Sequence, residues 1–163
     1  MMRFHFGALL LIFSALFCGM VSGAEIMAQE IVCAPGEERV VEVWLVDADA
    51  GLAGYIMTPS FNGDAISRLR FVPSDEFMLS EVDEESQRVA ALDLYDALHL
   101  GSDSYLLGTL FIAASQGGKS VISFDITEMT DDMGEPLEVT QDGIHISVGE
   151  ERSNIMIGLD TSL

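Results

Sequence analysis

Short apolar runs separated by turn residues recur along this chain, and their spacing predicts strands. Within 121–126, Ile122, Phe124 and Ile126 alternate with more polar residues, and 144–148 alternates in the same way. One apolar face with a period of two is the pattern of a half-buried antiparallel strand. No long segment keeps a helical period. The pattern predicts eight strands, at 28–33, 39–46, 54–61, 68–73, 88–95, 105–114, 119–126 and 143–148.

Turn signals divide these runs at regular intervals. They include Pro35-Gly36, Asn62-Gly63, Gly117-Gly118 and Gly134-Glu135-Pro136. Asparagine and glycine tolerate the positive φ angles of tight turns, and proline fixes φ at a turn position. Many short strands with such breaks between them are typical of an all-β sandwich or barrel.

The first 24 residues have a different character. Arg3 and His5 precede an apolar run at 7–21, and Ser22-Gly23-Ala24 supplies the small residues of a signal-peptidase site. The run is shorter than the roughly 20 apolar residues of a spanning helix, so it is not read as an anchor. We expect a signal peptide at 1–24, a secreted domain at 25–149 without a membrane span, and a loosely ordered tail at 150–163.

The net charge restricts the classes of partner that the chain could bind, and the cysteine content shows which interactions could stabilise the fold. The 163 residues carry 27 acidic and 7 basic side chains, a formal net charge of −20. Such a surface argues against nucleic acid and anionic lipid as partners. Cys33 is the only cysteine after Ala24, so no disulfide within the mature chain is expected. We expect Cys33 to be buried and the core strands to hold the fold.

Catalytic motifs are sparse. After the predicted leader the only histidines are His99 and His145, and no G-x-S-x-G sequence is present. Acidic residues are too common here for a glycosidase pair to be recognised. We therefore expect no enzyme activity.

No cofactor is predicted, although two acidic turns could offer oxygen ligands to a structural calcium ion. They contain Asp47 and Asp49, and Asp131, Asp132 and Glu135. Neither matches a known calcium loop, because Ala50 and Met133 stand where ligands would be expected. Carbohydrate binding is a further alternative, since Trp44 shares one face of its predicted strand with Glu42, Val40 and Val46 and is expected to be partly exposed.

The order of the turns and strands resembles that of cohesin domains, the receptor modules of cellulosome-type scaffolds. The resemblance covers about 28–148, nearly the whole mature chain. It rests on an ordered set of segments: Pro35-Gly36, Val41-Glu42-Val43-Trp44-Leu45, Gly51-Leu52-Ala53-Gly54, Phe61–Ile66, Tyr105–Ile112, Asp131–Leu137 and Gly143–Val148.

This resemblance implies an antiparallel jelly-roll β-sandwich of nine strands, one more than the eight read from the pattern. It also implies a non-catalytic module that binds a protein partner, the dockerin, across one sheet face, in polysaccharide-degrading or cell-surface assemblies. A carbohydrate-binding module of the same fold, with a polysaccharide as partner, is the alternative. Gly54 and Ile56 stand where well-studied cohesins carry polar dockerin contacts, and a fold can persist while its partner changes.

The period of two then predicts the binding residues. If Phe61 fills the core, Ile56 points outward. Strand 88–95 is expected to turn Ala90, Leu92 and Leu94 inward, which leaves Asp93 and Tyr95 outside. In strand 105–114 the resemblance implies that Leu106, Gly108, Leu110 and Ile112 point inward, which leaves Phe111 outside. The resemblance makes the three strands near neighbours, so the predicted partner-binding patch is Ile56, Asp93, Tyr95 and Phe111.

Overall fold

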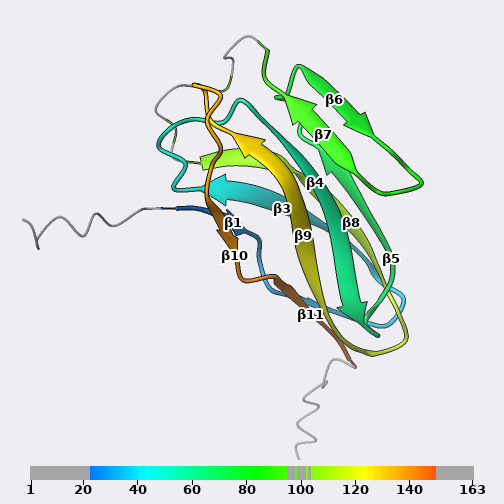
Figure 1. Ribbon diagram of the computed structural model, residues 1–163. Coiled ribbons are helices and arrows are strands. Elements are labelled where there is room, and N and C mark those ends of the chain that lie inside the picture. The colour runs from blue at the N-terminus through cyan, green and yellow to red at the C-terminus, as the bar shows by residue number, and fades with distance from the viewer. Residues whose placement is uncertain (1–22, 95–97, 99–101, 103, 150–163) are drawn as a thin grey trace, which may run out of the picture.

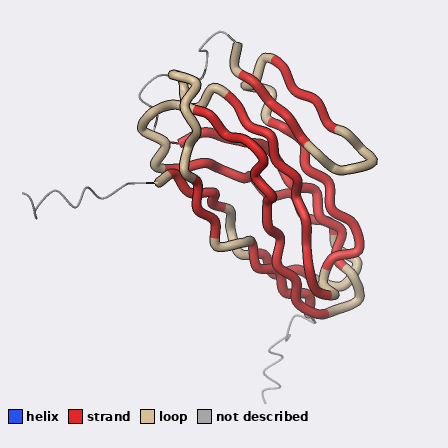
Figure 2. Tube along the Cα trace, viewed as in Figure 1, coloured by secondary structure: helices blue, strands red, loops and turns tan. Residues whose placement is uncertain are grey.

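The computed structural model of the protein describes residues 23–94, 98, 102 and 104–149. This part of the chain consists of strands and loops (Figure 2), and within it no helix is long and apolar enough to cross a membrane. The strands are β1 (Ala24–Met27), β2 (Ile31–Cys33), β3 (Glu38–Val46), β4 (Gly54–Gly63), β5 (Ile66–Pro73), β6 (Leu79–Val82), β7 (Val89–Leu92), β8 (Ser104–Ala114), β9 (Gly118–Thr130), β10 (Val139–Gln141) and β11 (Ile144–Val148). The predicted signal peptide and tail lie outside the described residues, apart from Gly23 and Ala24.

Two sheets pack face to face around one core. The six-stranded sheet has the order β2-β11-β9-β4-β7-β6, and its β9 and β4 cross in front of the other sheet in Figure 1. The five-stranded sheet has the order β10-β1-β3-β8-β5. All strand pairs are antiparallel except β1 with β10 and β2 with β11. The prediction of an all-β sandwich of jelly-roll type is therefore confirmed.

The strand count depends on two segments that change sheets. The segment 24–33 holds two short strands, β1 in the five-stranded sheet and β2 in the six-stranded sheet, and of the strand expected at 28–33 only Ile31–Cys33 is a strand. Near the C-terminus β10 and β11 divide in the same way. Taking each divided segment as one strand gives nine, the number that the resemblance implied. The pattern alone missed β1, β6 and β10.

The core is built from alternate residues of both sheets. Ile122 and Phe124 on β9 and Ile144, Ile146 and Val148 on β11 are all buried, as their alternation predicted. The Phe124 ring meets Phe71 of the opposite sheet edge-on, with centroids 5.8 Å apart. Cys33 is also buried, as expected, and desolvation raises the pKa of its thiol.

A β-bulge in β8 corrects one part of the predicted facing. The register with β3 shifts between Val43 and Trp44, where Val43 pairs with Gly108 and Trp44 with Leu106, so Leu107 is the extra residue. From Gly108 to Ile112 the predicted inward positions hold, but before the bulge Tyr105 and Leu107 are buried and Leu106 is only half-buried. An extra residue reverses the alternation, because one strand then has two residues against its partner's one.

Candidate functional site

The four residues predicted as one partner-binding patch do not lie together. Ile56 is on β4 of the six-stranded sheet, whereas Phe111 is on β8 of the five-stranded sheet. Both point outward, so they lie on opposite outer faces of the sandwich. β8 pairs with β3 and β5, and it has no pairing with β4. Tyr95 lies outside the described residues. The prediction of a single patch is therefore wrong.

The facing predicted for strand 88–95 is also wrong. Val89 and Ala91 are buried, while Leu92 and Leu94 are 41% and 60% exposed. Ala91 pairs with Tyr55 and Val89 with Met57, and both partners point into the core. Paired residues share a face of the sheet, so Ala91 must point inward although leucine is the more hydrophobic. Leu92 is thereby placed on the outer surface.

We call the outer surface of β6, β7, β4 and β9 the front face. The register aligns two rows across it. One row runs Glu81, Ala90, Ile56, Glu128, and the next runs Leu79, Leu92, Gly54, Thr130. Leu79 is 54% exposed and Ile56 is half-buried. The rows combine an exposed apolar surface with a carboxylate at each end of the first row.

Gly54 lets the second row form. A Cβ at this position would lie 2.6 Å from Leu92 Cδ2 and 2.7 Å from the carbonyl oxygen of Ala91. The Leu92 side chain thus occupies the space that a side chain at residue 54 would take. The absence of a polar side chain at Gly54, noted in the sequence, has a packing reason here.

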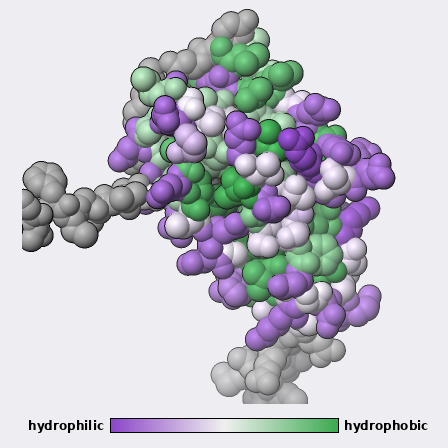
Figure 3. Space-filling view, viewed as in Figure 1, coloured by the Kyte–Doolittle hydropathy of each residue, from purple (hydrophilic) through white to green (hydrophobic). Residues whose placement is uncertain are grey.

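Farther along β4 and β9 the front face becomes polar and its side chains short. Thr58 pairs with Asp125 and Ser60 with Ser123, with the two serine hydroxyl oxygens 3.3 Å apart. In Figure 3 hydrophobic residues gather at the upper end of the view, and over the rest hydrophilic and hydrophobic residues are mixed. In the described chain, no phenylalanine, tyrosine or tryptophan points outward from β6, β7, β4 or β9. The expected core residue Phe61 shares the inward side of β4, but at 40% exposure it does not fill the core.

Asp93, the remaining residue of the predicted patch, forms hydrogen bonds with the backbone of two loops. Its carboxylate accepts a hydrogen bond from the Leu98 amide at 2.7 Å, and its own amide donates to the Ala53 carbonyl at 2.8 Å. It is half-buried. Asp93 directly follows Leu92, and its hydrogen bond to Ala53 holds the end of β7 against the start of β4.

The pattern of apolar and polar residues did not predict Leu79, Glu81 and Leu92 as surface residues of this face. The sequence did contain a signal for the β6–β7 hairpin, because the polar residues at 83–87 separate the short runs at 79–82 and 89–92. The Asp83 carboxylate accepts amide hydrogen bonds from Glu85 and Ser86, and the Ser86 hydroxyl and these amides hold the pKa of Asp83 below its usual range. This is a local turn motif that joins β6 to β7.

The two acidic turns weighed for calcium are adjacent in space. A Cβ on Gly51 would overlap the carboxylate of Asp132, and the Asp132 amide donates to the Ala50 carbonyl. The Asp131 carboxylate accepts hydrogen bonds from the Met133 and Glu135 amides at 2.9 and 2.8 Å. Across the described ranges no three His, Cys, Asp or Glu side chains form a group that could share a metal ion.

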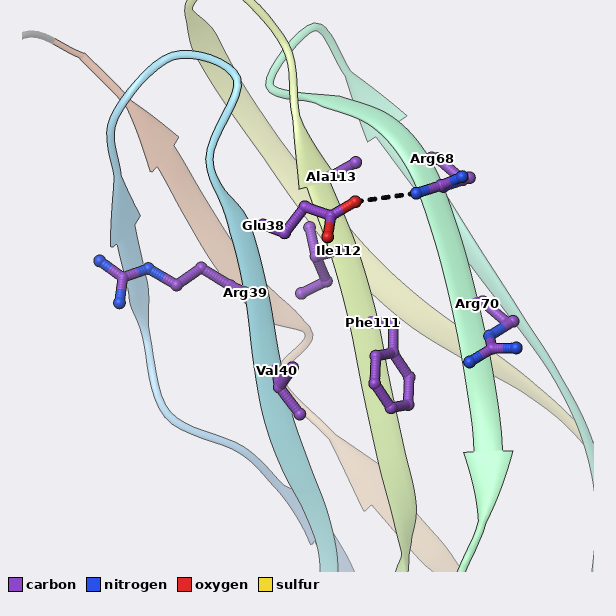
Figure 4. Close-up of a pocket in the computed structure, with 8 residues that line it drawn as sticks. All are labelled: Glu38, Arg39, Val40, Arg68, Arg70, Phe111, Ile112 and Ala113. Atoms are coloured by element: carbon purple, nitrogen blue, oxygen red, sulfur yellow. Dashed lines mark hydrogen bonds and ion pairs between the residues drawn. The ribbon is translucent and has the colours of Figure 1, made fainter.

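The opposite surface, the outer side of β1, β3, β8 and β5, is here called the back face. Trp44 is 36% exposed on it, so the prediction of partial exposure is confirmed. Its indole Nε1 donates a hydrogen bond to Glu42 at 3.2 Å. Figure 4 shows the end of this face around Phe111, whose ring lies between Val40 of β3 and Arg70 of β5.

No family model matches the sequence, and no curated protein matches it. The fold, however, is similar to solved cohesin structures. A type I cohesin–dockerin complex from Clostridium thermocellum matches with a TM-score of 0.56 and 16% identity, over 78% of this chain and 99% of the matched chain.

Two further structures agree. The sixth cohesin of scaffoldin B from Acetivibrio cellulolyticus, solved with a dockerin, has a TM-score of 0.59 and 17% identity, over 78% and 99% of the two chains. A non-cellulosomal cohesin from the archaeon Archaeoglobus fulgidus has a TM-score of 0.61 and 14% identity, over 80% and 94%. The chain therefore has the cohesin fold.

Proposed function

We propose that this chain is a secreted, non-catalytic module that binds a dockerin-type protein partner across its front face. The observation that carries the proposal is the match of nearly the whole sandwich to cohesins, some of which were solved in complex with dockerins. Similarity at 9–17% identity concerns the fold, so the choice of face rests on the surface of this chain.

The front face has the make-up of a protein interface. Leu79, Leu92 and Ile56 form an apolar centre, and carboxylates and hydroxyls surround it. Protein interfaces combine an apolar core with a polar rim that supplies hydrogen bonds. The short side chains of Ser60 and Ser123 let a partner approach the backbone of β4 and β9 closely. Binding here depends on apolar anchors where other cohesins use polar contacts.

A protein partner fits this face better than a polysaccharide. Sugar rings stack on exposed aromatic side chains, and the described front face presents none. The acidic surface and the predicted leader suit work outside the cell, in polysaccharide-degrading or cell-surface assemblies. In that setting the module would connect a partner enzyme or surface protein through its front face.

The test uses a panel of purified dockerins, including those of the Clostridium thermocellum and Acetivibrio cellulolyticus complexes, with binding measured by surface plasmon resonance. Insoluble cellulose and xylan serve as the carbohydrate arm. At least one dockerin should bind, and Ile56→Ser with Leu92→Ser should weaken it by about 2 kcal/mol, roughly 30-fold, if these residues are hot spots. Circular dichroism should show that the double variant stays folded.

Val32→Ser is the matched control, because Val32 is an exposed apolar strand residue, 68% exposed, away from β4 and β7. It should leave dockerin binding unchanged. Binding to the polysaccharides and to no dockerin would reject the proposal. Dockerin binding that is unaffected by the double variant would move the site off the front face.

A further inference from the structure

The back face carries exposed apolar and aromatic side chains, interrupted by Glu42 and Thr109, that the proposed function does not use. The register across β1, β3, β8 and β5 arranges this face in successive rows. The first row is Met27, Trp44 and Leu106, the next is Glu42, Thr109 and Val72, and the third is Val40, Phe111 and Arg70. Val40 is 61% and Met27 50% exposed, and more than a third of the Trp44, Val72 and Phe111 surfaces is exposed. Exposed tryptophan, phenylalanine and arginine are characteristic of interaction surfaces.

This face also differs from the rest of the molecule in charge. The protein has a net charge of −20, yet Arg68 and Arg70 stand here beside Glu38 and Glu42. Arg68 pairs with Glu38 at 2.9 Å (Figure 4). With Glu25, which points outward from β1, the back face carries three carboxylates and two guanidinium groups, so it is much closer to neutral than the whole chain. Two copies of a strongly acidic protein repel one another least where such a surface meets its own counterpart.

Opposite charges on the back face remain available to a second copy. The Arg70 guanidinium lies over the Phe111 ring, 4.8 Å from its centroid, and the structure describes no ion pair to it. Stacking on an aromatic ring leaves the edge of the guanidinium open to a carboxylate. Glu42 accepts only the Trp44 indole hydrogen bond among the described contacts. The backbone positions of Arg70 and Glu42 are about 12 Å apart, two strands across and two residues along.

We propose that the back face is a self-association surface, through which two copies of this chain form a two-fold dimer. A symmetric dimer buries the same patch of both subunits. A two-fold axis in the plane of the interface, crossing β8 between Thr109 and Phe111, brings each Arg70 opposite Glu42 of the other copy. Val40, Phe111 and Val72 of the two copies then cover one another.

The size of the face sets the strength of the dimer. Four strands span about 19 Å, and the six residue steps from Glu38 to Trp44 span about 20 Å. Each copy contributes roughly 400 Å² of flat surface, so the total of about 800 Å² lies below the roughly 1,200 Å² of stable interfaces and in the range of weak, transient contacts. The dimer is therefore weak, and its dissociation constant lies in the micromolar range or above.

Back-to-back association leaves both front faces exposed and pointing in opposite directions. Such a dimer would hold two partner sites in one particle and gain avidity for surfaces that carry several partners. The self-association itself does not depend on the identity of the partner, so it stands or falls separately from dockerin binding.

Sedimentation velocity of the purified full chain at 10–500 μM, in 0.15 and 0.5 M NaCl, tests the proposal. The weight-average mass should rise toward that of a dimer, more so at higher salt, because salt screens the net repulsion while apolar contact persists. Arg70→Glu and Glu42→Arg should each raise the dissociation constant at least tenfold. Combining the two should restore it, because the exchanged charges then face each other across the axis with opposite signs again.

Arg88→Glu is the control, because it changes the net charge as Arg70→Glu does, but at the β6–β7 turn. It should leave association unchanged. A monomer at 500 μM in both salts overturns the proposal, and so does a dimer that resists both single substitutions. Dimerisation abolished by Ile56→Ser with Leu92→Ser would place the contact on the front face. Dimerisation that appears only after removal of 150–163 would show that this segment covers the back face of its own chain.

Discussion

Tyr55→Phe tests the contact between the sheets at the β8 bulge. Tyr55 is 1% exposed, and its hydroxyl donates a hydrogen bond to the Leu107 carbonyl at 2.6 Å. Leu107 is the extra residue of the bulge, and its carbonyl also accepts the Ser74 amide at 3.0 Å. Phenylalanine keeps the ring and its edge-on contact with Phe77. Because the Leu107 carbonyl retains one donor, the loss at pH 7 should be that of one hydrogen bond, about 1 kcal/mol.

At alkaline pH the order of stability should change. Burial raises the pKa of Tyr55 far above that of a tyrosine in an unfolded chain. The unfolded state therefore loses its proton first, and the stability that Tyr55 contributes below about pH 10 is lost as pH rises above that value. One unit above the unfolded pKa this loss is about 1.4 kcal/mol. Phenylalanine has no hydroxyl to ionise, so the variant does not undergo this loss of stability. At pH 11 Tyr55→Phe should therefore equal or slightly exceed the natural protein in its free energy of unfolding.

Urea denaturation followed by circular dichroism, at pH 7 and pH 11 and one ionic strength, measures the difference. The remaining tyrosines and the Cys33 thiol titrate in both proteins, so their effects cancel in the comparison. A difference in unfolding free energy of the same size at both pH values would refute the reasoning. It would mean that the Tyr55 hydroxyl reaches solvent or that the interface opens before it ionises.

Four other outcomes follow from the core, the close strand contacts, the acidic turns and the leader. Phe124→Ala should cost about 3–5 kcal/mol, and an unchanged urea midpoint would contradict its burial. Gly108→Ala should cost about 1–3 kcal/mol, because its Cβ would lie 2.3 Å from the Val72 carbonyl oxygen, whereas Gly117→Ala, with nothing nearer than 3.9 Å, should be close to neutral in the same melts. EDTA should leave the melting temperature unchanged, and a fall that calcium reverses would reveal a structural ion. Mass spectrometry of the secreted protein should find the N-terminus at or near Glu25, and an intact Met1 in a membrane fraction would show an anchor instead.

The sequence by itself determined the fold class and much of the core. The alternation in 121–126 and 144–148 predicted the buried and exposed sides of β9 and β11, because period two is a local property of an extended chain. Turn residues placed most of the boundaries between strands for the same reason. The resemblance to cohesins implied the count of nine strands, because it compares the order of turns and strands over a whole domain. The pattern within single segments gave eight.

The tertiary structure decided which residues share a surface. No local pattern shows that β8 pairs with β3 and β5, and this pairing separates Phe111 from Ile56. Ala91 of β7 points inward because it lies opposite Tyr55 in the neighbouring strand. Comparing the hydrophobicity of the residues within β7 gives no information about this partner. One extra residue at Leu107 reverses the facing of the start of β8. Sheet neighbours and register are set by contacts distant in sequence, so the make-up of the front and back faces emerges only when the strands are paired.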